Sequence, residues 1–126
     1  MADAPKVKWL DEAQEKDYAA ARNYLSLLVP GPDLDRLIDR LKKAPSGSWR
    51  AKDILRATSL PLLGLKQSEE VAEKLEKIRT GERLSPILIV ILRPDVVAQI
   101  ADGYHRTCAA YLAHEDTLVP GRILFV

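Results

Sequence analysis

The chain has 126 residues, of which 47% are hydrophobic and 29% are charged, as in ordinary globular domains rather than disordered or membrane-spanning chains. Its 19 basic and 18 acidic residues give a net charge of +1, so no overall field attracts nucleic acid or membranes, and DNA is not an expected partner. No apolar run reaches the roughly 20 residues that span a bilayer, the N-terminus lacks a signal-peptide pattern, and the single Cys108 suits a reducing compartment, so we expect one cytoplasmic domain.

The first part of the chain predicts a pair of helices. Apolar residues recur at helical spacing over 18–28, and Pro30 ends that pattern. Asp33 is well placed to cap a second helix, whose apolar stripe runs over 34–41. We therefore expect two packed helices here.

The middle of the chain contains one clear helix after a less regular stretch. Residues 45–48 predict a loop, and residues 49–57 are compatible with either a short helix or irregular chain. Ser68 is a typical N-cap residue, followed by an apolar stripe and by Gly81 as a C-terminal stop. This pattern predicts a helix between Ser68 and Gly81.

The last third of the chain changes from helical to strand periodicity. Continuous apolar runs at 87–92 and 96–101 predict two strands with both faces covered, and residues 104–114 return to helical spacing. Residues 122–126 predict a closing strand. The order of elements predicts an α+β fold, with a small mixed sheet packed against helices.

The run Asp102-Gly103-Tyr104-His105-Arg106 is the most chemically distinctive segment. It predicts a strand-to-helix turn, in which the first backbone N–H groups of the helix and the helix dipole favour a bound anion. Gly103 permits a positive φ and a close approach of a ligand, and Asp102 is placed to cap the helix.

The two basic residues of this turn allow two interpretations. Positive charge in the first turn opposes the helix dipole by about 0.3–1 kcal/mol per charge, so something negative should compensate for His105 and Arg106. In one interpretation Asp102 does so and the turn only serves the fold. In the other, a phosphate or carboxylate ligand does so. Helical geometry predicts that Cys108 faces the core, whereas His105 and Arg106 face a cleft.

From about residue 71 to 126 the sequence resembles the ParB/sulfiredoxin superfamily. The order of helix, proline-led strand, Asp-Gly turn, alanine-rich helix and Val-Pro strand is similar to the family's. The segments that carry the resemblance are 75–81, 84–90, 100–106, 109–111 and 119–120. It implies a ParB/sulfiredoxin-like core over about 65–126, preceded by an N-terminal helical extension over about 1–64.

The resemblance implies a nucleotide or phosphate site at the turn. Sulfiredoxins bind ATP there, ParB proteins bind CTP, and some relatives are free-serine kinases. By position, Gly103, His105 and Arg106 correspond to the phosphate-binding turn, with Asp102 beside them, and Ser85 corresponds more loosely. The implied ligand is a nucleoside triphosphate such as ATP, with Mg²⁺.

Departures from the family pattern limit the expected activity. Tyr104 stands where sulfiredoxins have their catalytic cysteine, and the acidic residue and extra arginine of the ParB turn are replaced by Tyr104 and His105. Repair of cysteine sulfinic acid and CTP-gated DNA clamping are therefore not expected. For the serine kinases, neither Glu70 nor Glu82 can be matched to a catalytic glutamate from sequence.

The expected function is binding of a nucleotide or another phosphorylated small ligand at the Gly103 turn, and the sequence leaves open whether a reaction follows. A small-molecule phosphotransferase using the same turn is the first alternative. The second is a non-catalytic protein-interaction or homo-oligomerising module. No metal site is expected, because His105, Cys108 and His114 lack a convergent ligand pattern.

Overall fold

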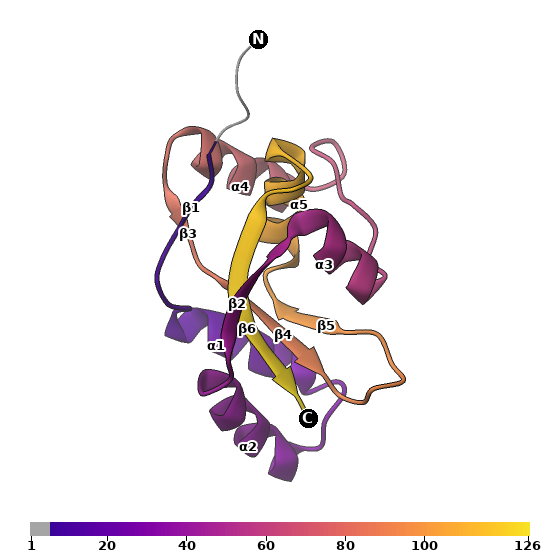
Figure 1. The fold of residues 1–126 in the computed structure, drawn as a ribbon. Coiled ribbons are helices and arrows are strands. Elements are labelled where there is room, and N and C mark those ends of the chain that lie inside the picture. The colour runs from indigo at the N-terminus through magenta and orange to yellow at the C-terminus, as the bar shows by residue number, and fades with distance from the viewer. Residues whose placement is uncertain (1–5) are drawn as a thin grey trace.

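The computed structural model describes residues 6–126, which form an α+β fold, as predicted (Figure 1). The signal-peptide expectation rests on residues 1–5, which lie outside this range. The helices are α1 (Glu15–Leu25), α2 (Gly31–Lys42), α3 (Ala51–Thr58), α4 (Glu69–Arg79) and α5 (Tyr104–Ala113). The strands are β1 (Lys8–Trp9), β2 (Ser46–Arg50), β3 (Arg83–Leu84), β4 (Ile87–Ile91), β5 (Gln99–Asp102) and β6 (Leu118–Phe125).

The main sheet has four strands in the order β2-β6-β4-β5, and β1 pairs with β3 in a separate parallel pair. The central strand β4 is antiparallel to β5 and parallel to β6, and β2 is antiparallel to β6. The chain therefore passes from β5 through α5 to β6, on the other side of β4. Because Leu88 pairs with Asp102, α5 begins beside the start of β4.

Helices cover both faces of this sheet. Alternate residues of β4 point to opposite faces, so Leu88 and Val90 pack in one core with α1 and α2. Ile87 and Ile89 pack on the opposite face with residues of α3 and α5. A third cluster joins α4 to α5. The burial of β4 on both faces explains its continuous apolar run.

Two of the predicted helices are confirmed closely. The hydroxyl of Ser68 accepts a hydrogen bond from the N–H of Val71 at 3.2 Å, so Ser68 caps α4 as expected. The helix ends at Arg79, and Gly81 follows with φ of +80°. Helix α5 follows the predicted range, and Cys108 is fully buried, as its position on the apolar stripe predicts.

Helix α2 and strand β2 correct the expectations for the first part of the chain. Asp33 does not cap α2, because the helix already begins at Gly31, after Pro30, and Asp33 lies in its first turn. Residues 46–50 form β2 rather than a loop, because they pair along β6. Residues 6–64 therefore contain strands as well as helices, and one of these strands, β2, belongs to the main sheet.

The remaining differences concern the bounds of short elements. Residues 51–58 form α3, which decides between the two alternatives that the sequence left open. Strand β5 begins at Gln99 rather than at residue 96, because residues 96–98 lie in the loop after β4. Strand β6 begins at Leu118 rather than at residue 122, because Pro120 and Gly121 pair within the sheet. A Cβ on Gly121 would lie 2.5 Å from the carbonyl oxygen of Ile87, so glycine permits this close strand contact. Among the described residues, no helix is both long and apolar enough to cross a bilayer.

Candidate functional site

The α5 turn, residues 102–106 between β5 and the start of α5, is built around Gly103. This residue precedes the helix with φ of +113°, a conformation that strains residues with a side chain. A Cβ at this position would lie 2.4 Å from Cγ2 of Ile87 on β4. Both the backbone conformation and the packing therefore require glycine, independently of any ligand.

Arg106 is held inside the fold rather than facing a cleft, which corrects the prediction. One terminal nitrogen, Nη2, donates to Oδ2 of Asp102 at 2.9 Å and to the carbonyl oxygen of Pro86 at 3.2 Å. The other, Nη1, lies 3.8 Å from Oδ1 of Asp17 on α1. The side chain is only 11% exposed, and its Nε has no hydrogen-bond partner among the described residues. Asp102 binds this arginine and makes no side-chain capping bond to α5.

The polar network of Arg106 continues to the start of α1. Oδ2 of Asp17 accepts a hydrogen bond of 2.7 Å from the backbone N–H of Gln14. The hydroxyl of Ser85 lies 3.3 Å from the side-chain oxygen of Gln14, so it faces α1 rather than the first turn of α5. The sequence did not indicate Asp17 and Gln14, because their contacts join residues at the start of α1 to residues far along the chain.

The two carboxylates around Arg106 perturb the titration of Asp102. Burial raises the pKa of the Asp102 carboxyl, and the nearby Asp17 carboxylate raises it further. The guanidinium of Arg106 acts in the opposite direction without reversing the shift. The charge of Arg106 is therefore already balanced by two acidic neighbours, as the interpretation of the turn as fold architecture expects.

His105 is the member of the turn that faces outward. Its side chain is 39% exposed, and Nε2 lies 3.1 Å from Oε2 of Glu70 in the first turn of α4. The backbone N–H groups of Tyr104, His105 and Arg106 lie too early in α5 to bond within the helix, and the described residues supply them with no backbone acceptor. The first turn of α5 also contains no acidic residue. Helix α5 thus presents free donors beside an exposed imidazole.

Tyr104 and Cys108 are used for packing. The Tyr104 hydroxyl donates to the carbonyl oxygen of Pro61, which fixes the segment between α3 and α4 against α5. Burial raises the pKa of the Cys108 thiol, which lowers its fraction of reactive thiolate. The buried Cys108 thiol is therefore not presented for reaction, and Tyr104 has no thiol. The basic residues Lys52, Lys77 and Arg79 pair with nearby surface carboxylates.

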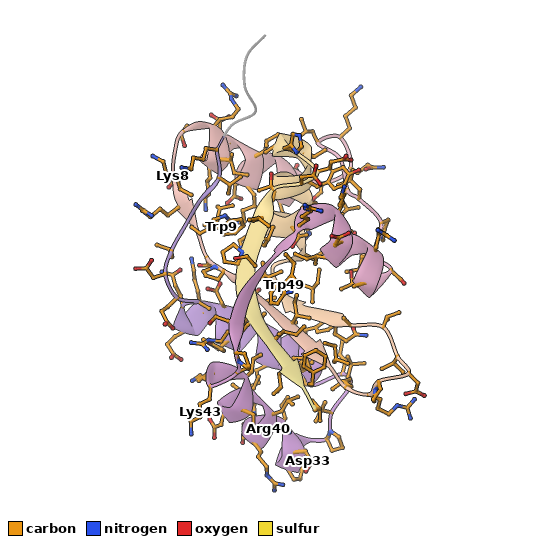
Figure 2. All side chains as sticks on the ribbon, in the orientation of Figure 1. Lys8, Trp9, Asp33, Arg40, Lys43 and Trp49 are labelled. Carbon is orange, nitrogen blue, oxygen red and sulfur yellow. The ribbon has the colours of Figure 1, made fainter. Side chains whose placement is uncertain are left out.

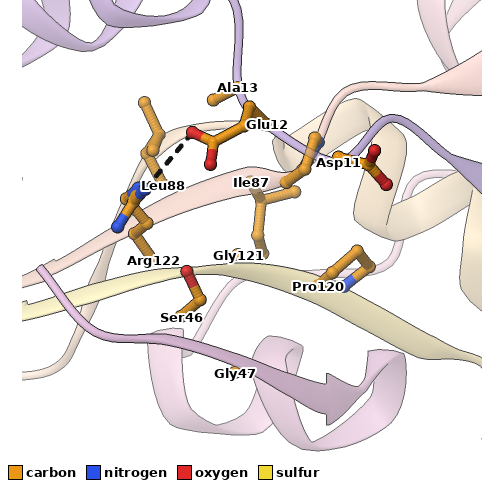
Figure 3. A pocket seen from close by; sticks show the side chains of 11 residues that line it. Asp11, Glu12, Ala13, Ser46, Gly47, Ile87, Leu88, Pro120, Gly121 and Arg122 are labelled. Carbon is orange, nitrogen blue, oxygen red and sulfur yellow. Dashed lines mark hydrogen bonds and ion pairs between the residues drawn. The ribbon is translucent and has the colours of Figure 1, made fainter. Parts of the chain in front are cut away.

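Five hollows among the described residues are lined by neither Tyr104, His105 nor Arg106. One of them, of about 50 Å³, lies beside Ile87 and is bordered by Glu12 and Arg122 (Figure 3). An ion pair of 3.3 Å joins these two side chains across it. Its volume suits ordered water rather than a nucleotide.

Among residues 6–126, no three histidine, cysteine or acidic side chains converge in a way that could hold a metal. The free N–H groups can donate hydrogen bonds to an anion but cannot ligate a cation. No family model, curated protein or solved structure matches this chain.

Proposed function

We propose that the protein binds a phosphoryl group, carried by a nucleotide or another small molecule, at the first turn of α5. The observation that carries the proposal is the set of free N–H donors at Tyr104, His105 and Arg106, beside the exposed imidazole of His105. Helix N-termini bind phosphate through such donors and through the helix dipole. Arg106 has a positioning role here, because its guanidinium ties the turn to α1.

Glu70 is the natural competitor of this ligand. Its carboxylate already contacts Nε2 of His105. A bound phosphoryl group must therefore displace this carboxylate or lie beside it, where the two negative charges repel each other. The carboxylate is also 67% exposed, so it can move away without breaking any buried contact. Removing its charge should therefore strengthen anion binding.

The test is a thermal-shift titration with ATP, ADP, CTP and GTP, each at about one millimolar. Binding to the folded state alone raises the melting temperature, and saturation at 100 times Kd adds about 2.7 kcal/mol to the free energy of unfolding. His105→Ala should weaken binding about tenfold, since it removes a side-chain donor beside the free N–H groups. Glu70→Gln should strengthen binding.

Two control variants separate local from general effects. His114→Ala removes the other histidine, which follows the opposite end of α5, and should leave binding unchanged. Glu76→Gln is the control for Glu70→Gln. It removes a carboxylate later in α4, where Glu76 pairs with Arg79, and should leave binding unchanged. Absence of stabilisation by every nucleotide, or equal losses in His105→Ala and His114→Ala, would contradict the proposal.

The position of Glu70 supports a second candidate function, a small-molecule phosphotransferase. The contact of 3.1 Å between Glu70 and His105 places a carboxylate beside the proposed phosphoryl position, where it could accept the proton of an attacking hydroxyl. With Mg²⁺, ATP and pooled amino acids and metabolites, the wild-type protein should then release ADP and Glu70→Gln should not. Tighter ATP binding without turnover in Glu70→Gln would support this function. Binding without turnover in the wild type would instead favour a protein that binds the ligand without catalysing a reaction.

A further inference from the structure

An apolar hollow beside the main sheet lies on the side opposite α1 and α2. It has a volume of about 380 Å³ and is bounded by α3, by the loop between β4 and β5, and by the sheet. Its walls include four isoleucines, at positions 54, 89, 91 and 123. Trp49, on β2 beside α3, forms another wall (Figure 2).

The hollow exists because α3 is short. Eight helical residues cover about 12 Å, whereas the eight residues of β6 extend over about 26 Å. Beyond Ile123 on the same face, Phe125 is 66% exposed, so the helical cover ends before the strand does. The N–H of Ala98 donates to the carbonyl oxygen of Ala57 at 3.3 Å, which closes one end of the hollow by joining the loop to α3.

The polar groups of the hollow carry no unbalanced charge. Asp53 is its single charged lining residue, and Oδ1 of this carboxylate lies 3.4 Å from Nη1 of Arg56. The Thr58 hydroxyl donates to the carbonyl oxygen of Ile54 at 2.8 Å, so its proton is already used and only its oxygen can accept. An anionic head group therefore finds no cation in the lining, and the one carboxylate open to a cationic head group is already paired with Arg56.

From this balance and from the apolar walls, we infer that the hollow is a binding site for a small neutral apolar molecule that carries at most a hydroxyl group. The volume lies within the range of roughly 300–1,000 Å³ that is typical of small-molecule sites, and such sites combine apolar walls with few polar groups. The Thr58 oxygen is the acceptor available to a ligand hydroxyl. This site lies on α3 and is independent of the α5 turn.

Three probes of nearly equal size test the inference, namely benzyl alcohol, benzylamine and benzoate. The readout is the NMR shift of the isoleucine methyl groups of Ile89, Ile91 and Ile123 during titration of the whole chain. Benzyl alcohol should shift these methyls saturably, and the cationic and anionic probes should bind about tenfold more weakly, since burying a charge without a partner is costly. Equal binding of all three probes overturns the claim of neutrality.

A filling variant shows whether binding occurs in the hollow. Ala57 is exposed at its open side, so Ala57→Leu should occupy the space without disturbing the core and should abolish the shifts. Ala20→Leu adds the same group at an exposed position of α1 and should leave binding intact. Unchanged binding in Ala57→Leu, or no saturable shift at about ten millimolar benzyl alcohol, would overturn the site. Shifts that depend on protein concentration alone would assign the hollow to a second copy of the chain instead.

Discussion

Gly103 illustrates how a residue can resemble a ligand-binding element for structural reasons. The sequence indicated the positive φ correctly, but the side chain of Ile87, which closes on the glycine from β4, could not be predicted from local sequence. An Asp-Gly turn therefore gives weaker support for a ligand than the sequence alone suggested. The N–H groups of α5 that lack an acceptor, not Gly103, carry the proposal.

Gly103→Ala should destabilise the protein strongly. The added methyl group would strain a backbone with φ of +113° and overlap Ile87, which together should lower the free energy of unfolding by about 2–5 kcal/mol. Gly31→Ala is the matched control, because its Cβ meets nothing within 4 Å. This control should change stability by less than about 1 kcal/mol. Urea denaturation measures both, and similar values for the two variants would refute this account of Gly103.

Arg106 stabilises the fold, so its substitution affects stability as well as the binding of any ligand. Removing it leaves Asp102 and Asp17 buried without their partner, a change that typically costs about 3–5 kcal/mol. Loss of nucleotide binding in Arg106→Ala would therefore not distinguish a ligand contact from unfolding. His105, which is more exposed, is the better residue for testing the site.

At the scale of elements, the Asp102–Arg106–Asp17 network fastens α1 to the β5–α5 turn. Its two carboxylates face one guanidinium, and burial together with Asp17 raises the pKa of Asp102 above its ordinary value. The folded state therefore retains a proton that the unfolded chain loses above pH about 4. As the pH rises from there through the folded pKa, Asp102 contributes progressively less stability.

Asp102→Asn should expose this dependence. The stability of the wild type relative to the variant should fall as the pH rises from about 4 towards neutrality. Asp116→Asn provides the opposite sign, because its hydrogen bond with Lys52 lowers the pKa of Asp116. In that comparison the wild type should lose relative stability as the pH falls below about 4, since the folded pKa of Asp116 lies below its ordinary value. Chemical denaturation from below pH about 4 to neutrality measures both, and the same sign of slope for the two variants in their own pH windows would contradict the assignment.

The sequence predicted elements with strong local signals better than those defined by distant partners. Ser68 marks the start of α4, and the apolar run of β4 is explained by burial on both faces. Strand β2 was missed because Ser46, Gly47 and Ser48 are residue types common in turns, and only their pairing with β6 makes them a strand. Likewise, Asp17 could not be assigned to Arg106, because the contact joins residues far apart in the chain.

At the scale of the whole molecule, the two proposed sites lie on different parts of one α+β framework. The first turn of α5 lies at the end of β5, beside α4, and the apolar hollow lies beneath α3. Residues of the first part of the chain contribute to both: Asp17 fixes Arg106 at the turn, and Trp49 walls the hollow. The N-terminal part thus completes the sheet and supports both surfaces (Figure 1).

The most direct test of the central claim is an amide NMR titration of the whole chain with ADP, compared with adenosine, which lacks a phosphoryl group. The account predicts saturable shifts of the backbone N–H groups of Tyr104, His105 and Arg106 with ADP and none with adenosine, because N–H donors at a helix N-terminus bind the phosphoryl oxygens. Shifts confined to other residues, equal shifts with adenosine, or no shifts at all would contradict it.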